Sequence, residues 1–187
     1  FELDILADHV LRPVPKRPPV SADEPCLAAL APGTGTTKTA WLWAYARDDS
    51  TFGGSGPPMV AYRFEDSRSG DCVLRHLHGY GGILQVDGYA AYNKLVRKGG
   101  SNDGPRLAGC WAHSRRRFYE LHAAGDSRVA TTTVERMADL WKLEAEVRGK
   151  SPEERAAARQ AASAPIVAEL FLLWQKTLPR ISGKSKL

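Results

Sequence analysis

The sequence has little of what marks a secreted or membrane protein. It contains only three cysteines, Cys26, Cys72 and Cys110, and they lie far apart. An odd and scattered set of this kind is typical of reduced thiols in the cytosol rather than of a disulfide framework. No apolar run approaches the roughly 18 to 20 residues that span a bilayer, and no signal peptide opens the chain. These absences predict a cytoplasmic protein without a membrane segment.

What is present is the composition of a folded domain. Hydrophobic residues make up 43% of the chain and charged residues 25%, which excludes disorder throughout. A length of 187 residues suits one domain with a further helical segment. The net charge of +5 and the pI of about 9.2 permit nucleic-acid binding without requiring it.

The pattern of strands and helices predicts an α/β fold with a mixed sheet. Three strands joined by loops indicate an antiparallel meander, and the helices and strands that then alternate belong on and beside the same sheet. The predicted order is β-β-β-α-β-α-β-α, followed by helices only. The expected strands are residues 20–30, 40–46, 59–64, 83–86 and 106–113, and the expected helices between them are residues 69–80 and 90–96.

Three regions follow from this reading. Residues 1–19 form a helix remnant and a proline-rich linker, residues 20–125 the α/β core, and residues 126–187 a helical insertion. Pro25 within the first strand is expected to mark an edge or a bulge. In the helical region, Ser151 and the proline after it predict a helix start, and Pro165 is expected to break or kink that helix.

Two aspartates at strand ends are the candidate metal-binding residues. Asp23 lies in the first strand, and Asp87 directly follows the fourth. In a meander followed by a crossover, these two strands can lie side by side, and their carboxylates then converge. Converging carboxylates need a cation or a proton between them, and oxygen ligands favour Mg²⁺ or Mn²⁺. Glu24 would point to the opposite face of the strand, and Asp87 has a simpler interpretation as a turn or helix cap.

The remaining groups of candidate site residues each have more than one interpretation. Cys110 and His113 have a spacing that zinc tolerates, but no second pair accompanies them, so a zinc site is not expected. The basic run Arg115, Arg116 and Arg117 opposes the dipole of the helix that it begins. A DNA phosphate would compensate this charge, or the run is a solvated face. The alternating tryptophans near residue 42 predict sheet packing rather than base stacking.

Four blocks in order carry a resemblance to a known family: Val20–Glu24, Thr37–Asp49, Leu84–Asn93 and Gly109–Phe118. Together they resemble the catalytic domain of insertion-sequence-66-type transposases over nearly the whole chain from about Val20. The resemblance implies a ribonuclease-H-like fold and an Asp-Asp-Glu site that uses two Mg²⁺ or Mn²⁺ ions for DNA cleavage and strand transfer. It implies that Asp23 is the first acid and metal ligand and Asp87 the second, and it suggests a role for His113 near the acids or on DNA.

The sequence also departs from this family's pattern. The third acid of the family lies in an Asn-rich block ending Val-Glu-Arg, and Val134-Glu135-Arg136 lacks that lead, so we interpret it as coincidence. Together with the ends at Phe1 and Leu187, this predicts a fragment truncated before the third acid, and hence an incomplete or inactive copy. The expected partners are DNA and further copies of the chain, with no membrane, in the nucleoid region of a bacterial cytoplasm.

Two other functions are alternatives to a transposase core. One is a non-catalytic DNA-binding or dimerisation remnant, which would bind DNA in a salt-dependent manner without using Asp23 or Asp87. The other is an unrelated α/β hydrolase with His113 as a base, and the lack of a Gly-x-Ser-x-Gly motif argues against it.

Overall fold

The computed structural model describes residues 19–50, 54–98, 104–125 and 127–182, and the chain forms two compact units that divide between Cys110 and Trp111. We call residues 1–110 the sheet unit and residues 111–187 the helical unit. The division falls earlier than the boundary after residue 125 that the sequence suggested, because the first helix after the sheet packs against the next helix of the helical unit. The helix predicted near the N-terminus lies outside the described residues.

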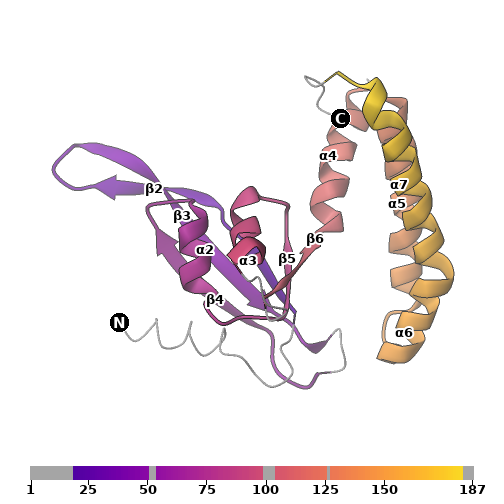
Figure 1. Cartoon of the computed structure of the whole chain (residues 1–187), viewed down its shortest axis with the longest axis horizontal. Helices are drawn as coiled ribbons and strands as arrows, with labels where there is room; N and C mark the ends of the chain where they lie inside the picture. The colour runs from indigo at the N-terminus through magenta and orange to yellow at the C-terminus, as the bar shows by residue number, and fades with distance from the viewer. Residues whose placement is uncertain (1–18, 51–53, 99–103, 126, 183–187) are drawn as a thin grey trace. The chain divides into compact units, whose positions relative to one another are not determined.

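The sheet unit is built on one mixed sheet (Figure 1). Strand β3 pairs antiparallel with β4 along one side and with β1 and β2 along the other, while β1, β5 and β6 run parallel to one another. The predicted mixed sheet with an antiparallel meander is therefore confirmed. The strands are β1 Val20–Asp23, β2 Cys26–Ala31, β3 Thr36–Arg47, β4 Met59–Glu65, β5 Ile83–Val86 and β6 Arg106–Gly109.

Strands β1 and β2 are the two halves of the first predicted strand. Both pair with β3 in one continuous register, from Asp23↔Ala44 to Cys26↔Trp41. Pro25 interrupts the ladder because it has no N–H to donate. Because the register is continuous, Pro25 inserts no extra residue and makes no bulge. Strand β2 lies at the edge of the sheet, where it forms with the start of β3 a hairpin that extends beyond the other strands (Figure 1).

Two helical segments cover one face of this sheet. Helix α2 spans Gly70–His76, and a short 3₁₀ turn, Ala90–Tyr92, leads into α3, Asn93–Lys98. Their apolar side chains join the inward residues of the strands in one core, in which Trp43 is fully buried, as the alternation of the tryptophans predicted. On the other face of β4, Val60, Tyr62 and Phe64 are about half exposed. Within the described residues, helices therefore cover one face of the sheet, and we call the face that carries these exposed side chains the open face.

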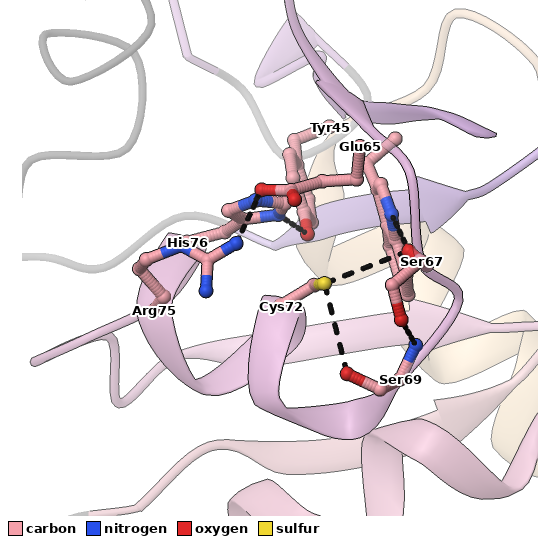
Figure 2. A network of polar contacts seen from close by, with 8 residues as sticks. Tyr45, Glu65, Ser67, Ser69, Cys72, Arg75 and His76 are labelled. Atoms are coloured by element: carbon pink, nitrogen blue, oxygen red, sulfur yellow. Dashed lines mark hydrogen bonds and ion pairs between the residues drawn. The ribbon is translucent and has the colours of Figure 1, made fainter. Parts of the chain in front are cut away.

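A polar network fixes α2 to the strands beneath it (Figure 2). His76 lies between the Tyr45 hydroxyl, 2.9 Å from Nδ1, and the Glu65 carboxylate, 2.9 Å from Nε2, and Arg75 donates to the same carboxylate. Burial lowers the pKa of His76. Burial alone would raise the pKa of Glu65, but the hydrogen bonds from His76 and Arg75 outweigh it, and the pKa is lowered. A neutral imidazole that accepts from Tyr45 and donates to Glu65 satisfies all these contacts.

The helical unit consists of helices joined by short turns. The first two, α4 and α5, pack on each other, and α7 packs on α5. The side chain of Ser151 accepts from the backbone N–H of Glu154, whose carboxylate accepts from the N–H of Ser151, which confirms the predicted helix start. The elements are α4 Trp111–Ala123, α5 Arg128–Glu146, α6 Pro152–Ala158, a π-helical turn Arg159–Ser163, α7 Ala164–Thr177 and a 3₁₀ turn Leu178–Arg180.

Of the two effects expected of Pro165, a break or a kink, the break does not occur. The π-helical turn Arg159–Ser163 directly precedes it, and its wider hydrogen-bond spacing accommodates a residue that lacks an N–H and crowds the preceding turn. The result is one helical stretch of 29 residues, Pro152–Arg180, which is long and apolar enough to cross a membrane by length and composition. This corrects the expectation that no segment reaches that length, although one such helix is weak evidence for a membrane span.

Candidate active site

The two predicted acids lie at equivalent positions on neighbouring parallel strands. Asp23 is the last residue of β1, and Asp87 directly follows β5. The register pairs Ser21 with Gln85, so continuing it by two residues brings Asp23 beside Asp87. Parallel neighbours lie about 4.8 Å apart. The predicted adjacency of the two strands is thus confirmed, and it brings the two acids to the same end of these parallel strands.

Both aspartates occupy exposed positions at the ends of their strands. Asp23 is exposed between the buried Ala22 and Glu24, and Asp87 is exposed after the buried Val86. Side chains alternate between the two faces along a strand, so this burial pattern assigns the two aspartates to the same side. The carboxyl ends of parallel strands are where α/β sheets place ligands.

Backbone N–H groups hold each carboxylate. Asp23 Oδ1 accepts from the N–H of Glu24 at 2.9 Å, and Asp87 Oδ1 accepts from the N–H of Tyr89 at 2.8 Å. The second bond needs the tight turn at Gly88, whose φ of 95° lies in the region that favours glycine. Asp87 therefore also stabilises the turn, which confirms the turn interpretation, whereas the 3₁₀ turn that follows has Tyr89 at its N-cap and no side-chain cap.

Glu24 occupies the opposite face, as its position next to Asp23 predicted. Its side chain is 1% exposed, and Arg68 binds its Oε1 atom through Nη2 at 2.5 Å and Nε at 3.2 Å. The Tyr92 hydroxyl donates to Oε2 at 2.6 Å. Burial raises the pKa of Tyr92 and the bond to Glu24 raises it further. Burial alone would lower the pKa of Arg68, but the bond to Glu24 outweighs it, and the pKa is raised.

Arg68 connects this buried carboxylate to the segment after Asp87. Its guanidinium lies 3.8 Å from the centre of the Tyr89 ring, and its backbone carbonyl accepts from the Tyr89 hydroxyl at 2.7 Å. Sequence reasoning missed Arg68, Tyr89 and Tyr92. The available signal was Glu24 itself, since a carboxylate on a covered face requires a cation and hydrogen-bond donors. Its partners come from distant parts of the chain, which the sequence pattern could not identify.

The oxygen atoms of this pair suit a hard divalent cation. The Oδ2 atoms of Asp23 and Asp87 have no hydrogen-bond partner among the described residues, and carboxylate oxygens are the ligands that Mg²⁺ and Mn²⁺ prefer. Within the described ranges, no group of three or more His, Cys, Asp or Glu side chains is placed to hold a metal ion. The pair therefore fits two ligands of a metal site, with no third carboxylate from the described part of the chain.

The predicted DNA-contacting residues all lie on α4 in the helical unit. Arg115 is held within that unit, 5.4 Å from the Tyr119 ring and 5.8 Å from the Trp141 ring. Arg116 and Arg117 are exposed. Nδ1 of His113 is buried and has no hydrogen-bond partner among the described residues. Of the three arginines, Arg116 and Arg117 are thus the better placed to meet a phosphate.

The cysteines agree with the expectation of reduced thiols. None of the three forms a disulfide: Cys26 is exposed, Cys72 is buried and Cys110 is partly buried. Cys110 and His113 are not part of a metal-binding group in the described residues. The zinc interpretation therefore gains no support.

Comparison with known proteins identifies the class: the sequence model of the transposase IS66 family matches residues 1–187. The chain belongs to this family. Among curated proteins, it is 58% identical over its full length to the uncharacterised protein y4qI of Sinorhizobium fredii, and 43% and 34% identical to y4jD and y4hP of the same organism. It spans 35%, 33% and 29% of their lengths.

Proposed function

We propose that this chain supplies two metal-binding carboxylates, Asp23 and Asp87, to the catalytic site of a DNA transposase that cleaves DNA and transfers strands. The observation that carries the proposal is the parallel pairing of β1 with β5, which supports a convergence of the two carboxylates that follow this register. The sheet order, in which an antiparallel meander is joined to two further parallel strands, supports a ribonuclease-H-like fold. Family membership supports the transposase role.

In this mechanism Asp23 and Asp87 would hold the cation. Two bound Mg²⁺ or Mn²⁺ ions would supply the activation of a water or a 3′-hydroxyl and the stabilisation of the leaving oxygen. The protein's own contribution is a pair of fixed negative charges, oriented by the backbone N–H groups of Glu24 and Tyr89. Exposed Arg116 and Arg117 would bind DNA phosphates. A third carboxylate is required from a residue outside those described.

The test uses a full-length transposase that carries this segment. Asp23→Asn and Asp87→Asn each keep the size of the side chain and remove the charge. We expect each to lower Mg²⁺-dependent cleavage of DNA carrying the element ends by at least a hundredfold, on the scale of losing an essential electrostatic group. Asp66→Asn is the matched control, because Asp66 is an exposed aspartate of the same unit that pairs with Lys38. Unchanged cleavage in Asp87→Asn would refute the proposal.

The second candidate is DNA binding without catalysis. It is favoured by the exposed arginines on α4, which belong to a different unit from the acids. Fluorescence anisotropy against duplex DNA at several salt concentrations separates the two candidates, because removing one arginine that binds a phosphate lowers the salt slope by about one. If Arg116→Ala weakens binding and Asp87→Asn changes neither binding nor cleavage, the non-catalytic function is the correct one.

The family membership also supports DNA as the partner and the bacterial cytoplasm as the location. Pairing of two element ends would require more than one copy of the chain, so we include a homo-oligomer in the proposal. Light scattering with and without end DNA tests it, and a monomer in both conditions would contradict it.

A further inference from the structure

Four residues on the covered face form a continuous connection between the two acids. We define the Glu24 clamp as Glu24, Arg68, Tyr89 and Tyr92. We infer that this clamp is a positioning device: it fixes the backbone after Asp23 and the backbone after Asp87 relative to each other, and so holds the two carboxylates in the geometry that a divalent cation needs. The inference rests on the proposed function, because it explains how the two proposed metal ligands are held in place relative to each other.

The connection begins at the residue next to Asp23. Both oxygens of Glu24 are engaged, Oε1 by Arg68 and Oε2 by Tyr92. The side chain is buried, so it cannot exchange these partners for water without a large cost. Because the N–H of Glu24 also donates to Asp23, any movement of Glu24 displaces the hydrogen bond that orients Asp23.

The connection ends at the residue that orients Asp87. Tyr89 is bound twice to Arg68, by its ring beneath the guanidinium and by its hydroxyl to the carbonyl. The N–H of the same Tyr89 donates to Asp87. The bond that orients Asp87 is therefore attached, through Arg68 and Glu24, to the strand that carries Asp23.

The arrangement has the features of an outer shell around a metal site. Groups that orient metal ligands are usually hydrogen-bonded side chains behind them, and their loss costs about ten- to a hundredfold in metal affinity. A clamp of this kind matters most where two ligands come from separate segments, since the cation alone would have to draw them together. Asp23 and Asp87 come from separate strands, and the clamp residues come from three segments of the sheet unit.

The experiment measures the two acids directly by NMR of the 187-residue chain. The variants are Glu24→Gln and Tyr92→Phe, which remove one charge and one hydroxyl with little change in volume. Tyr62→Phe is the matched control, because Tyr62 is 55% exposed on the open face. The readouts are the exchange rate of the Tyr89 amide in the absence of metal, and the shifts of the Glu24 and Tyr89 amides during a Mg²⁺ titration.

We expect both clamp variants to exchange the Tyr89 amide faster, while the core amides of Val73 and Leu84 keep their protection, and to bind Mg²⁺ about tenfold more weakly. Tyr62→Phe should match the wild type in both readouts. A merely structural role would lower stability without changing the Mg²⁺ response of the folded chain. The inference would be overturned if both clamp variants showed the Tyr89 exchange rate and the Mg²⁺ response of the wild type.

Failure of the proposed function gives a different result. If Mg²⁺ does not shift the wild-type amides, or shifts those of Asp87→Asn equally, the proposed metal site of this chain is wrong. The exchange rate of Tyr89 without metal then still decides whether the clamp holds the segment after Asp87.

Discussion

The two units of the chain bury different kinds of groups. Among the described residues, fifteen hydrophobic side chains are buried in the sheet unit and five in the helical unit, and α4 has none. The sheet unit also buries a carboxylate, Glu24, with its partners around it. The principal ion pairs of the helical unit, Arg136 with Glu169 and Arg159 with Glu144, are instead at the surface.

This difference indicates which contacts enforce a single arrangement of the segments in each unit. A buried charge is costly unless its partners are in place, so it enforces one arrangement of the segments that supply them. Surface ion pairs contribute little and tolerate alternatives. The sheet unit is therefore expected to respond sharply to the loss of a single polar partner, and the helical unit to depend on its aromatic packing around Trp174.

The largest effect is expected for Arg68→Met in the sheet unit. The substitution leaves Glu24 buried without its cation, which should lower the free energy of unfolding by about 3 kcal/mol. Arg75→Met is the matched control: its guanidinium is 61% exposed beside Glu65, so it should cost less than about 1 kcal/mol. Urea unfolding measures both. Equal losses in the two variants would show that the burial of the carboxylate does not set the cost of losing its cationic partner.

A smaller effect is expected for Trp174→Phe in the helical unit. The ring stack on Phe118, at 5.2 Å, can persist, but the indole N–H no longer donates to the fully buried hydroxyl of Thr133. We expect a loss of about 1 to 2 kcal/mol, seen as faster amide exchange in α5 and α7. Trp141→Phe, at a side chain 43% exposed, should stay within about 0.5 kcal/mol. Equal effects of the two substitutions would contradict this account.

The smallest effect is a pH dependence in the sheet unit. Because burial lowers the pKa of His76, the unfolded chain binds a proton below its ordinary pKa of 6.5 before the folded chain does. Stability is then lost as the pH falls from 6.5 toward the folded pKa, and the lowered pKa of Glu65 adds a further loss below 4.5.

Urea unfolding between about pH 7.5 and 5.5 checks this sign. His76→Gln should flatten the pH dependence, and His78→Gln, at an exposed neighbour on the same turn, should retain it. A wild-type protein that gained stability over this fall in pH would show that His76 is protonated in the fold.

Local patterns in the sequence predicted much of the fold and part of the candidate site. Alternating residues located the strands, the meander and the covered position of Trp43, and Ser151 with its proline located a helix start. Adjacency of the strands of Asp23 and Asp87 followed from the order of the elements, as did the opposite direction of Glu24. These features depend on neighbours in the chain and on strand geometry, which a sequence displays directly.

The sequence by itself therefore determined most of the elements, the family and the adjacency of the strands that carry Asp23 and Asp87. Only the tertiary structure decided that Arg68 and Tyr92 enclose Glu24, that Tyr89 links them to Asp87, and that the helix continues through Pro165. Arg68 and Tyr92 lie 44 and 68 residues from Glu24 in the sequence, and they contact its buried carboxylate only because the fold brings them close. No local pattern encodes that proximity, because packing of separate segments creates it.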